Sequence, residues 1–552
     1  MDNRQPQTSQ SDAPTAGNSV TGTAATPPGS AKPRVPPLTP AALRMLAVSL
    51  SGSFLVSLSA QFPSTNIADL QGAFGSTPDE ASWISTVYTM ASFAGIVVSG
   101  PMIKAIGMGR YMVANSLIVA VTALVCSHVM PLPWILALRT LQGFAAGGFG
   151  PVAFIAVFMV CGGARLPHGL TVLAFVLLFP VTLGPIVSAL VEEYFGWSGL
   201  FQLQAIFGAL LAFASSKWLP LNPGDRTALR TDWLAIAVLI LGLSMLMLVL
   251  SQGTRRFWFE SGMIVSCTAI SAGAWAAFVF LCRVSPAPII TPGTLLLRKF
   301  SVPIILNLVF RAGFVVTSYL VPQFLGLAQG YRPIQIAGLL SWAALPQAAA
   351  LPLVWFLLHK LDSRWIMGLG LVFCGAGTAL VTDTTAQFAA NQFQWAIAAF
   401  AIGQMFFLVP NLVVGASSLR PSDLPTASLA FNMTTLGGTT LGVAIVSNLV
   451  TEREKFHSNV LVENVSVFQS IDADRLSAIA TALGGRLIDD DAAMRAAVSN
   501  VAAVVRREAW VLSYNDGFLL VAAVLALSAL GVIWMGRCAP IERHFLNGSL
   551  QS

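Results

Sequence analysis

Two arginines inside long apolar runs carry the most unusual chemistry in this sequence. Arg139 is followed by Gln142 and Arg311 is preceded by Asn307, so each arginine has an amide on its own helix face. A charged side chain at the centre of a membrane helix costs about 2.5–3.5 kcal/mol on insertion scales, which favours an orientation toward a polar interior. Arg139 has an alternative, because it lies only about two turns after Pro133 and its side chain could reach the membrane surface.

Arg311 lies about ten residues from each end of its run, too deep to reach the surface in that way. Two interpretations are open. Arg311 and Asn307 contact an anionic or hydrogen-bond-accepting substrate in a cavity, or Arg311 makes a purely structural bond to carbonyls or amides of a facing helix. Ser59 and Gln61, at the end of the first apolar run, are the other polar residues predicted to line a substrate cavity.

Groups suited to catalysis, metal binding or proton transfer are sparse. No carboxylate occurs between Met45 and Ala68, and every Asp and Glu lies at the end of an apolar run, in a loop or in a tail. Arginine cannot replace a carboxylate as a proton carrier, because its pKa stays above about 12. The six cysteines form no CxxC pair or Cys/His cluster, and the five histidines are isolated. The sequence therefore predicts no enzyme, no metal site and no cofactor. The carboxylates nearest a membrane boundary are Glu192, Glu193, Asp232, Asp383 and Asp516.

The composition is that of an all-α polytopic membrane protein. Of 552 residues, 55% are hydrophobic and only 10% are charged, where soluble proteins have about a quarter charged. A helix crosses the hydrocarbon with about 20 apolar residues, far more than a barrel strand needs. Fourteen such runs are predicted as spans: 44–63, 81–103, 111–130, 133–158, 169–191, 197–216, 232–251, 261–282, 301–325, 333–358, 364–382, 392–414, 427–450 and 512–536.

Basic residues are concentrated in the loops on one side of these spans, and the short loops of the other side carry only Arg255, Arg256 and Arg332. By the positive-inside rule the basic side is cytoplasmic, and an even number of spans places both termini there. The formal charge of +6 is scattered over short loops without a basic stripe, so no nucleic-acid partner is predicted.

Two turns on the predicted cytoplasmic side resemble each other and suggest an internal duplication, as in transporters built from repeated helix bundles. The first contains Gly100, Lys104, Gly107 and Arg110, and the second contains Asp362 and Arg364. Both are predicted to act as gating loops. In the fourth span, Gly143 is four residues from Gly147 and can form a close helix contact. In the fifth span, Gly184 and Pro185 predict either a hinge or a static kink.

Three segments lie outside the predicted spans. Residues 1–41 and 541–552 are predicted as cytoplasmic tails, the first disordered because it is rich in Ser, Thr, Pro and Gly. The long outer loop 451–511 contains a predicted helix over 492–505, with acidic residues at 489–491 at its N-terminus. This loop is interpreted as a helical connector lying on the membrane surface, and alternatively as a docking surface for a periplasmic partner.

Taken in order along the chain, these motifs resemble the major facilitator superfamily, and in particular its fourteen-span drug:proton antiporter branch of the EmrB/QacA type. The N-terminal signatures are the 100–110 turn, the 139–143 segment and Gly184-Pro185. The branch is indicated by the segments 69–73, 79–83, 427–428, 436–438, 453–457 and 512–518. Ser59 stands where the family usually carries a first-span aspartate, and no arginine precedes the 436–438 segment.

The resemblance implies two six-helix bundles, 42–218 and 301–540, joined by the two linker helices of 219–300. It also implies alternating access with proton-coupled export of lipophilic compounds from a bacterial inner membrane. Among Gram-negative members it implies a periplasmic adaptor and an outer-membrane channel. The family roles carried over are proton coupling for Arg139, with Gln142 and Gly143, and the antiporter hinge for Gly184 and Pro185. Two alternatives stay open: an organic-anion exporter or facilitator without proton antiport, and a membrane sensor or scaffold that transports nothing.

Overall fold

The computed structural model describes residues 38–62, 67–285, 289–417, 419–463, 470–484 and 490–536. Its contacts divide the chain into Met1–Leu38 and Thr39–Ser552, and the second unit is the one considered below. Most of the predicted N-terminal tail and all of the predicted C-terminal tail lie outside the described residues. The first helix starts at Pro40, one residue before the predicted end of the tail at residue 41, because Thr39 caps it through the Ala42 backbone N–H.

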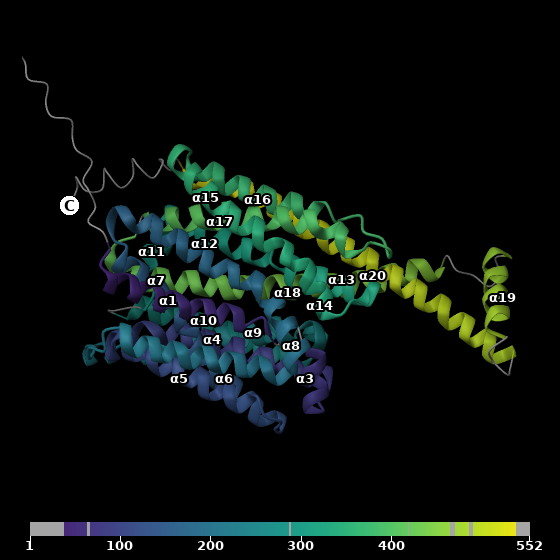
Figure 1. Cartoon of the computed structure of the whole chain (residues 1–552), viewed down its shortest axis with the longest axis horizontal. Coiled ribbons are helices and arrows are strands. Elements are labelled where there is room, and N and C mark those ends of the chain that lie inside the picture. The colour runs from purple at the N-terminus through teal and green to yellow at the C-terminus, as the bar shows by residue number, and fades with distance from the viewer. Residues whose placement is uncertain are drawn as a thin grey trace, which may run out of the picture. The chain divides into compact units, whose positions relative to one another are not determined.

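The described residues form helices and turns and contain no strand, which confirms the all-α prediction. The helices are α1 (Pro40–Ser59), α3 (Ile67–Phe74), α4 (Pro78–Ile106), α5 (Met108–Cys126), α6 (Leu132–Gly147), α7 (Phe149–Val160), α8 (Leu166–Trp218), α9 (Trp233–Gln252), α10 (Gly262–Val284), α11 (Pro292–Leu296), α12 (Arg298–Ala312), α13 (Val321–Gln329), α14 (Pro333–Leu340), α15 (Ala344–Lys360), α16 (Ser363–Ala379), α17 (Gln394–Ser417), α18 (Leu424–Glu463), α19 (Ser470–Gly484) and α20 (Asp490–Gly531) (Figure 1).

Twelve stretches of the described chain are long and apolar enough to cross a membrane. One of them, α8, has 53 residues and contains a residue with non-helical backbone angles, Gly196 (φ 69°), between the predicted fifth and sixth spans. The predicted eleventh span corresponds to α16, whose 17 residues are just short of a crossing helix. Counting α8 twice and adding α16 gives fourteen, and that number stays a prediction.

Three predicted spans are interrupted rather than continuous. The fourth divides at Gly148 into α6 and α7, and the tenth divides into α14 and α15. The ninth contains a π-helical segment, Val316–Leu320, between α12 and α13. Such irregular backbone inside a membrane helix is tolerated where protein or a cavity covers it. Gly148 and Val316 are buried, whereas Trp342 at the break between α14 and α15 is half exposed.

Two glycines set the distance between α4 and α6. An added Cβ on Gly143 would overlap the Tyr88 carbonyl oxygen, and one on Gly147 would overlap the Ser92 carbonyl oxygen. Small residues let membrane helices approach this closely. The close contact that the sequence indicated at these two glycines is therefore formed with α4.

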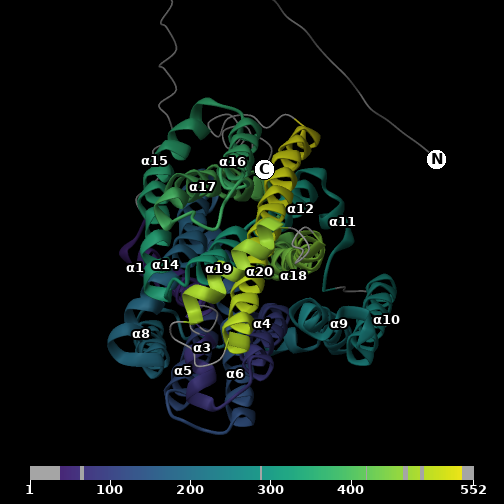
Figure 2. The ribbon, with the colours of Figure 1, turned by 90° about the vertical axis from the view of Figure 1, so that its right-hand side faces the viewer.

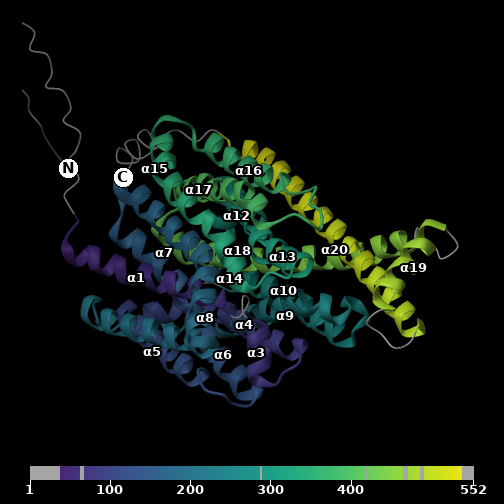
Figure 3. The same cartoon turned by 45° about the vertical axis from the view of Figure 1, so that its right-hand side comes forward.

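The helices before residue 218 and those after residue 298 meet along α8, which runs beside α14 and α15 (Figures 2 and 3). Three side-chain pairs follow this contact along the helix. They are Glu193 with Arg332 (N–O 3.0 Å), Thr182 with Gln347 (2.9 Å) and His168 with Trp355 (ring centroids 4.2 Å). On the other side of the bundle, α18 packs against α4, α7 and α9. Helices α9 and α10 pack on each other at the margin of the bundle (Figure 2).

Helices α18 and α20 both run well past the length of a membrane span, with 40 and 42 residues. Helix α19 packs against α20, and Figure 1 shows this pair beyond the end of the bundle. The predicted helix over 492–505 exists, but it is the first part of α20 and continues without a break into the last span. The interpretation as a connector lying along the surface is therefore wrong for this helix. Residue 489 of its predicted acidic start lies outside the described residues.

Candidate functional site

Arg139 is enclosed by the N-terminal helices, with an exposed fraction of 1%. Its Nη1 donates a hydrogen bond of 2.6 Å to Gln142 Oε1, as their spacing on α6 indicates. The guanidinium carbon lies 4.4 Å from the ring centroid of Tyr88 on α4, at cation–π distance. Arg139 Nε has no hydrogen-bond partner, and within the described part of the chain no carboxylate pairs with this charge. The arginine therefore turns inward, and the alternative of a side chain that reaches the surface is not what the structure has.

Arg311 is also enclosed, at 3% exposed, and its Nε and Nη2 have no hydrogen-bond partner among the described residues. The guanidinium carbon lies 5.1 Å from the ring centroid of Phe314, one turn later. Asn307 donates from Nδ2 to the hydroxyls of Thr434 (3.0 Å) and Thr435 (3.2 Å) on α18, while its Oδ1 is unpartnered. A buried donor on Arg311 and a buried acceptor on Asn307, both unsatisfied, indicate a place for a small polar partner.

Ser59 and Gln61 belong to different surroundings at the end of α1. Ser59 is 1% exposed, and its hydroxyl has no hydrogen-bond partner among the described residues. Gln61 lies against α8, where an added Cβ on Gly184 would come within 2.5 Å of Gln61 Cγ. The structure thus brings together a residue predicted for the cavity and a residue predicted for the hinge. Helix α8 keeps helical backbone angles at Pro185, so the predicted kink does not break the helix there.

The first of the two predicted gating turns, between α4 and α5, packs on the connector that follows α8. Gly107 has φ 86° in the left-handed region, and an added Cβ there would overlap the Asn222 carbonyl oxygen. Arg110 Nε donates to the Leu221 carbonyl (3.0 Å), and the Lys104 carbonyl accepts from the Asp225 backbone N–H (2.9 Å). A Cβ on Gly100, by contrast, would meet nothing within 4 Å.

The second predicted gating turn, between α15 and α16, has a different arrangement. Asp362 caps α16 by accepting from the Arg364 backbone N–H (3.1 Å), and the two side chains form an ion pair of 3.0 Å. Arg364 and Asp362 therefore bind each other, whereas Arg110 of the first turn binds backbone of a distant segment. The two turns occupy corresponding positions in the sequence, but their arginines have different partners.

One polar chain across the two halves was not predicted. Thr182 on α8 donates to Gln347 Oε1 on α15 (2.9 Å), and Gln347 Nε2 donates to Gln404 Oε1 on α17 (2.7 Å). Gln347 and Gln404 are 0% and 3% exposed. Both stand inside apolar runs of the sequence, as Gln142 does, so the same criterion of an amide within a span would have found them.

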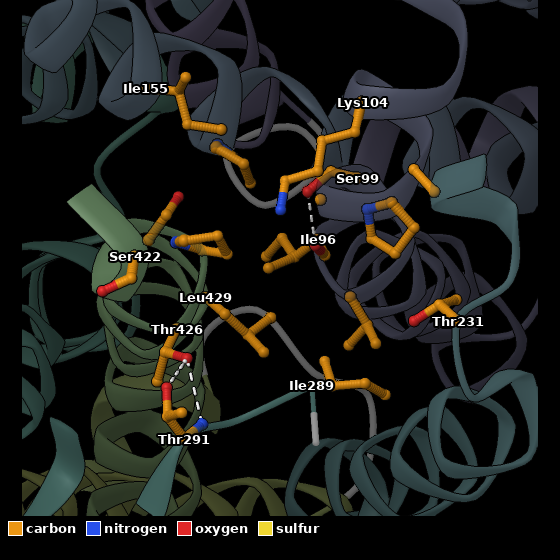
Figure 4. Close-up of a pocket in the computed structure, with 17 residues that line it drawn as sticks. Ile96, Ser99, Lys104, Ile155, Thr231, Ile289, Thr291, Ser422, Thr426 and Leu429 are labelled. Atoms are coloured by element: carbon orange, nitrogen blue, oxygen red, sulfur yellow. Dashed lines mark hydrogen bonds between the residues drawn. The ribbon is translucent and has the colours of Figure 1, made fainter. Parts of the chain in front are cut away.

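A pocket of about 290 Å³ lies where the two halves meet the linker helices (Figure 4). Its walls come from α4, α7, the segments on either side of α9 and α10, and the start of α18. The residues lining it are Ile96, Val97, Ser99, Gly100, Pro101, Lys104, Pro151, Ile155, Ala228, Thr231, Ile289, Thr291, Ser422, Pro425, Thr426, Ser428 and Leu429. Of the residues predicted for the site, Gly100 and Lys104 line it, and Arg139, Arg311, Asn307, Ser59 and Gln61 do not.

Comparison with known proteins places this arrangement in a family. A family model described as Major Facilitator Superfamily matches residues 49–285. The Multidrug export protein EmrB of Escherichia coli (strain K12) is 23% identical over 516 residues, which cover 91% of this chain and 96% of that protein. By this likeness the chain has the major facilitator fold. It is a multi-pass membrane transporter and not an enzyme.

Further relatives of this facilitator are similar over most of their length. The Colistin resistance protein EmrB of Acinetobacter baumannii is 21% identical, covering 89% of this chain and 96% of that protein. The Fatty acid resistance protein FarB of Neisseria gonorrhoeae is 21% identical, covering 91% and 97%. Among solved structures, the proton:xylose symporter XylE has the same fold at a TM-score of 0.53 and 10% identity, covering 87% of this chain and 94% of that one.

At the base of its long outer helices this facilitator has a charged cluster that joins α18 to α20. Asp516 Oδ2 accepts from Arg453 Nε (2.5 Å) and lies 2.8 Å from His457 Nε2. The neighbouring Asn515 exchanges hydrogen bonds with Thr384, in the connection between α16 and α17. The cluster therefore fixes the two long helices to each other and to the bundle.

We expect Asp516→Asn to loosen this junction without unfolding the bundle. The loss should be about 1–2 kcal/mol, because a charge-assisted hydrogen-bond pair is removed from a side chain that is still 30% exposed. Hydrogen exchange of 453–463 and 490–511 should become roughly tenfold faster or more, while exchange in α4 and α6 stays as it is. Asp474→Asn on exposed α19 is the matched control, and equal effects of both variants would contradict a specific clamp.

Proposed function

We propose that this facilitator exports small lipophilic or amphipathic compounds by alternating access, coupled to the proton gradient. The observation that carries the proposal is the pocket shared by α4 and α7 of one half, α18 of the other and the linker segments. A site at the junction of two bundles is where rocking of one bundle against the other changes access. The names of the relatives, a multidrug export protein and resistance proteins, agree with export of such compounds.

The proposed division is two six-helix bundles, 42–218 and 301–540, with helices 7 and 8 of 219–300 as a linker. Two observations support it: α8 meets α14 and α15 along its length, and α9 and α10 pack mainly on each other. The proposed site residues divide in the same way. Arg139, Gln142, Gly143, Gly184 and Pro185 would serve coupling and hinge motion in the first bundle. Ser59, Gln61, Asn307 and Arg311 would line the path, and the two cytoplasmic turns would gate it.

We place the protein in a bacterial inner membrane with both termini in the cytoplasm, on the charge asymmetry of its loops. In that orientation the pocket opens on the cytoplasmic side, and the ends of α18 and α20 with α19 stand outside. Two of the three arginines in the short outer loops are neutralised locally, Arg255 by Asp79 (3.6 Å) and Arg332 by Glu193 (3.0 Å). A periplasmic adaptor with an outer-membrane channel is the proposed partner of the outer helices.

A second candidate function is export of an organic anion without proton antiport. It is favoured by Arg139 and Arg311, which are buried without a carboxylate partner in the described part of the chain. Such a charge is costly in a membrane protein unless function requires it. A sensor or scaffold without transport is the third possibility, and the intact pocket speaks against it.

The test is transport by the purified protein in vesicles, with an imposed pH gradient and a panel of lipophilic drugs and organic acids. Proton movement that depends on drug would establish the proton-coupled exporter. Anion flux that follows membrane potential, without proton movement, would establish the second function instead. Absence of flux for the whole panel, with folded protein in the vesicles, would support the sensor or scaffold.

The Arg311→Met variant tests whether Arg311 contacts the transported compound. We expect it to lower transport of anionic compounds by about 10-fold or more, because a charge-assisted hydrogen bond is worth about 1.5–3 kcal/mol, and to leave cationic drugs unaffected. Thermal stability should be kept or raised, since an unpaired buried charge is replaced by an apolar side chain of similar length. Unchanged transport of every compound at normal expression would mean that Arg311 has a structural role only.

A further inference from the structure

The pocket at the junction with the linker has a lining of two kinds. Most of its wall is apolar, including Ile96, Ile155 and Leu429, and several serines and threonines are spread among these residues (Figure 4). Among the described residues that line it, Lys104 alone is charged. Figure 4 shows the Lys104 side chain extending from its helix into the pocket, toward the wall that carries Ser422.

Lys104 has no acidic partner among the described residues. The described residues offer it no ion pair or side-chain hydrogen bond, although its backbone carbonyl is fixed by the Asp225 N–H (2.9 Å). The acids near the pocket are engaged elsewhere. Asp225 accepts from the Thr227 backbone N–H and hydroxyl, and Asp423 accepts from the Thr294 hydroxyl (3.1 Å). Within the described part of the chain, Lys104 is therefore an unpaired cation on one wall of the pocket.

A second observation comes from the start of α18. Ser428 lines the same pocket, is only 2% exposed, and its hydroxyl has no hydrogen-bond partner among the described residues. A buried hydroxyl without a partner is costly, because its desolvation is not offset. The nearby hydroxyls differ from it, since Thr291 and Thr426 bond each other at 2.8 Å (Figure 4). Ser428 is thus an unsatisfied buried donor in the wall of the pocket that Lys104 also lines.

We propose that this pocket binds the anionic head group of an amphiphile, a carboxylate or phosphate on an apolar chain. Lys104 supplies the charge, Ser428 donates a hydrogen bond, and the apolar wall holds the first part of the chain. The volume of about 290 Å³ is at the lower end for ligand pockets, which suits a head group better than a whole lipid. The proposal rests on the exporter function in naming anionic amphiphiles as a substrate class. Binding of the head group in this pocket does not depend on transport.

The test measures binding to the full-length protein without any gradient. Two fluorescent probes of equal chain length are used, a dansyl-labelled alkyl carboxylic acid and the corresponding dansyl-labelled alkyl amine. Lys104→Gln should weaken binding of the acid about tenfold or more and leave the amine unchanged, while Lys104→Arg should keep most of the affinity for the acid. Lys217→Gln, another exposed lysine of the same side that does not line the pocket, is the matched control and should change neither.

The opposite outcomes are equally clear. Equal weakening of both probes by Lys104→Gln, or no change in either, overturns the proposal. Ser428→Val should weaken the acid as well, and normal acid binding by that variant removes Ser428 from the site. If the wild-type protein binds the acid but transports nothing, the exporter function is overturned and the binding site stands. If it transports drugs but does not bind the acid, the binding site is overturned and the exporter function stands.

The head group has two possible sources, a bilayer phospholipid and a free amphiphile. Binding of the acid probe is therefore repeated in discs of phosphatidylcholine and of phosphatidylglycerol. Weaker binding in phosphatidylglycerol for the wild type, and no such difference for Lys104→Gln, shows that the anionic lipid itself occupies the pocket. Equal binding in both discs shows that the free amphiphile is the ligand.

Discussion

Arg139→Met should leave the protein folded and remove most of its transport. The guanidinium makes a 2.6 Å hydrogen bond to Gln142 and lies 4.4 Å from the ring centroid of Tyr88. The methionine side chain can form neither the hydrogen bond nor the cation–π contact. Losing a charge-assisted hydrogen bond of about 1.5–3 kcal/mol corresponds to about a 10- to 100-fold loss of rate, if transport passes through this contact. Stability should change little, because removing a buried unpaired charge offsets the lost bond.

Initial transport rates in vesicles and melting of the purified protein test this split. Arg139→Lys keeps the charge but has no planar group to lie over Tyr88, so it should recover only part of the rate. Arg226→Met removes an exposed arginine and should change neither measurement. Full transport by Arg139→Met would mean that the charge of Arg139 is not used in the cycle.

Gly143→Val should prevent stable folding. The new Cβ would overlap the Tyr88 carbonyl oxygen, which belongs to the backbone of α4 and cannot turn aside. Separating α4 from α6 to make room also pulls Tyr88 away from Arg139, so the cost should reach at least about 3 kcal/mol, the upper end for overpacking. We expect little monodisperse protein in gel filtration and a clearly lower melting temperature.

The matched control is Gly273→Val. Gly273 is also inside a membrane helix, α10, but an added Cβ there would meet nothing within 4 Å. Both variants add the same β-branched side chain to a helix, so the difference between them isolates the contact with α4. Similar yields for the two proteins would mean that α4 and α6 can separate without loss.

The length of the apolar runs predicted the class of this fold well, because lipid imposes a long continuous apolar helix that the sequence shows directly. Because these runs are continuously apolar, the sequence does not indicate where a helix breaks. Gly148 and the π-helical segment Val316–Leu320 lie within unbroken apolar stretches, and their conformation depends on neighbours from distant parts of the chain. Spacing along one helix correctly predicted neighbours on the same helix face, as the hydrogen bond between Arg139 and Gln142 shows.

Contacts between helices could not be read in this way. Nothing in the local pattern links Gln347 to Thr182, which is 165 positions away, or Lys104 to the pocket that it shares with Ser428. These pairs form because two bundles and a linker meet, and their register is set by the packing of whole helices. Polar residues inside the predicted spans indicated that partners exist, while the identity of the partners required the three-dimensional structure.

The long outer helices have a mechanical consequence. Residues 490–511 of α20 precede its predicted span and are about 33 Å long at 1.5 Å per residue. The helix is continuous, and Asp516 clamps its base to α18, so this part acts as a stiff lever on the second half. A rocking motion of about 10° would move its tip by roughly 6 Å at that length. Whatever touches the tip would therefore sense which way the transporter faces, and by pushing on it could bias the cycle.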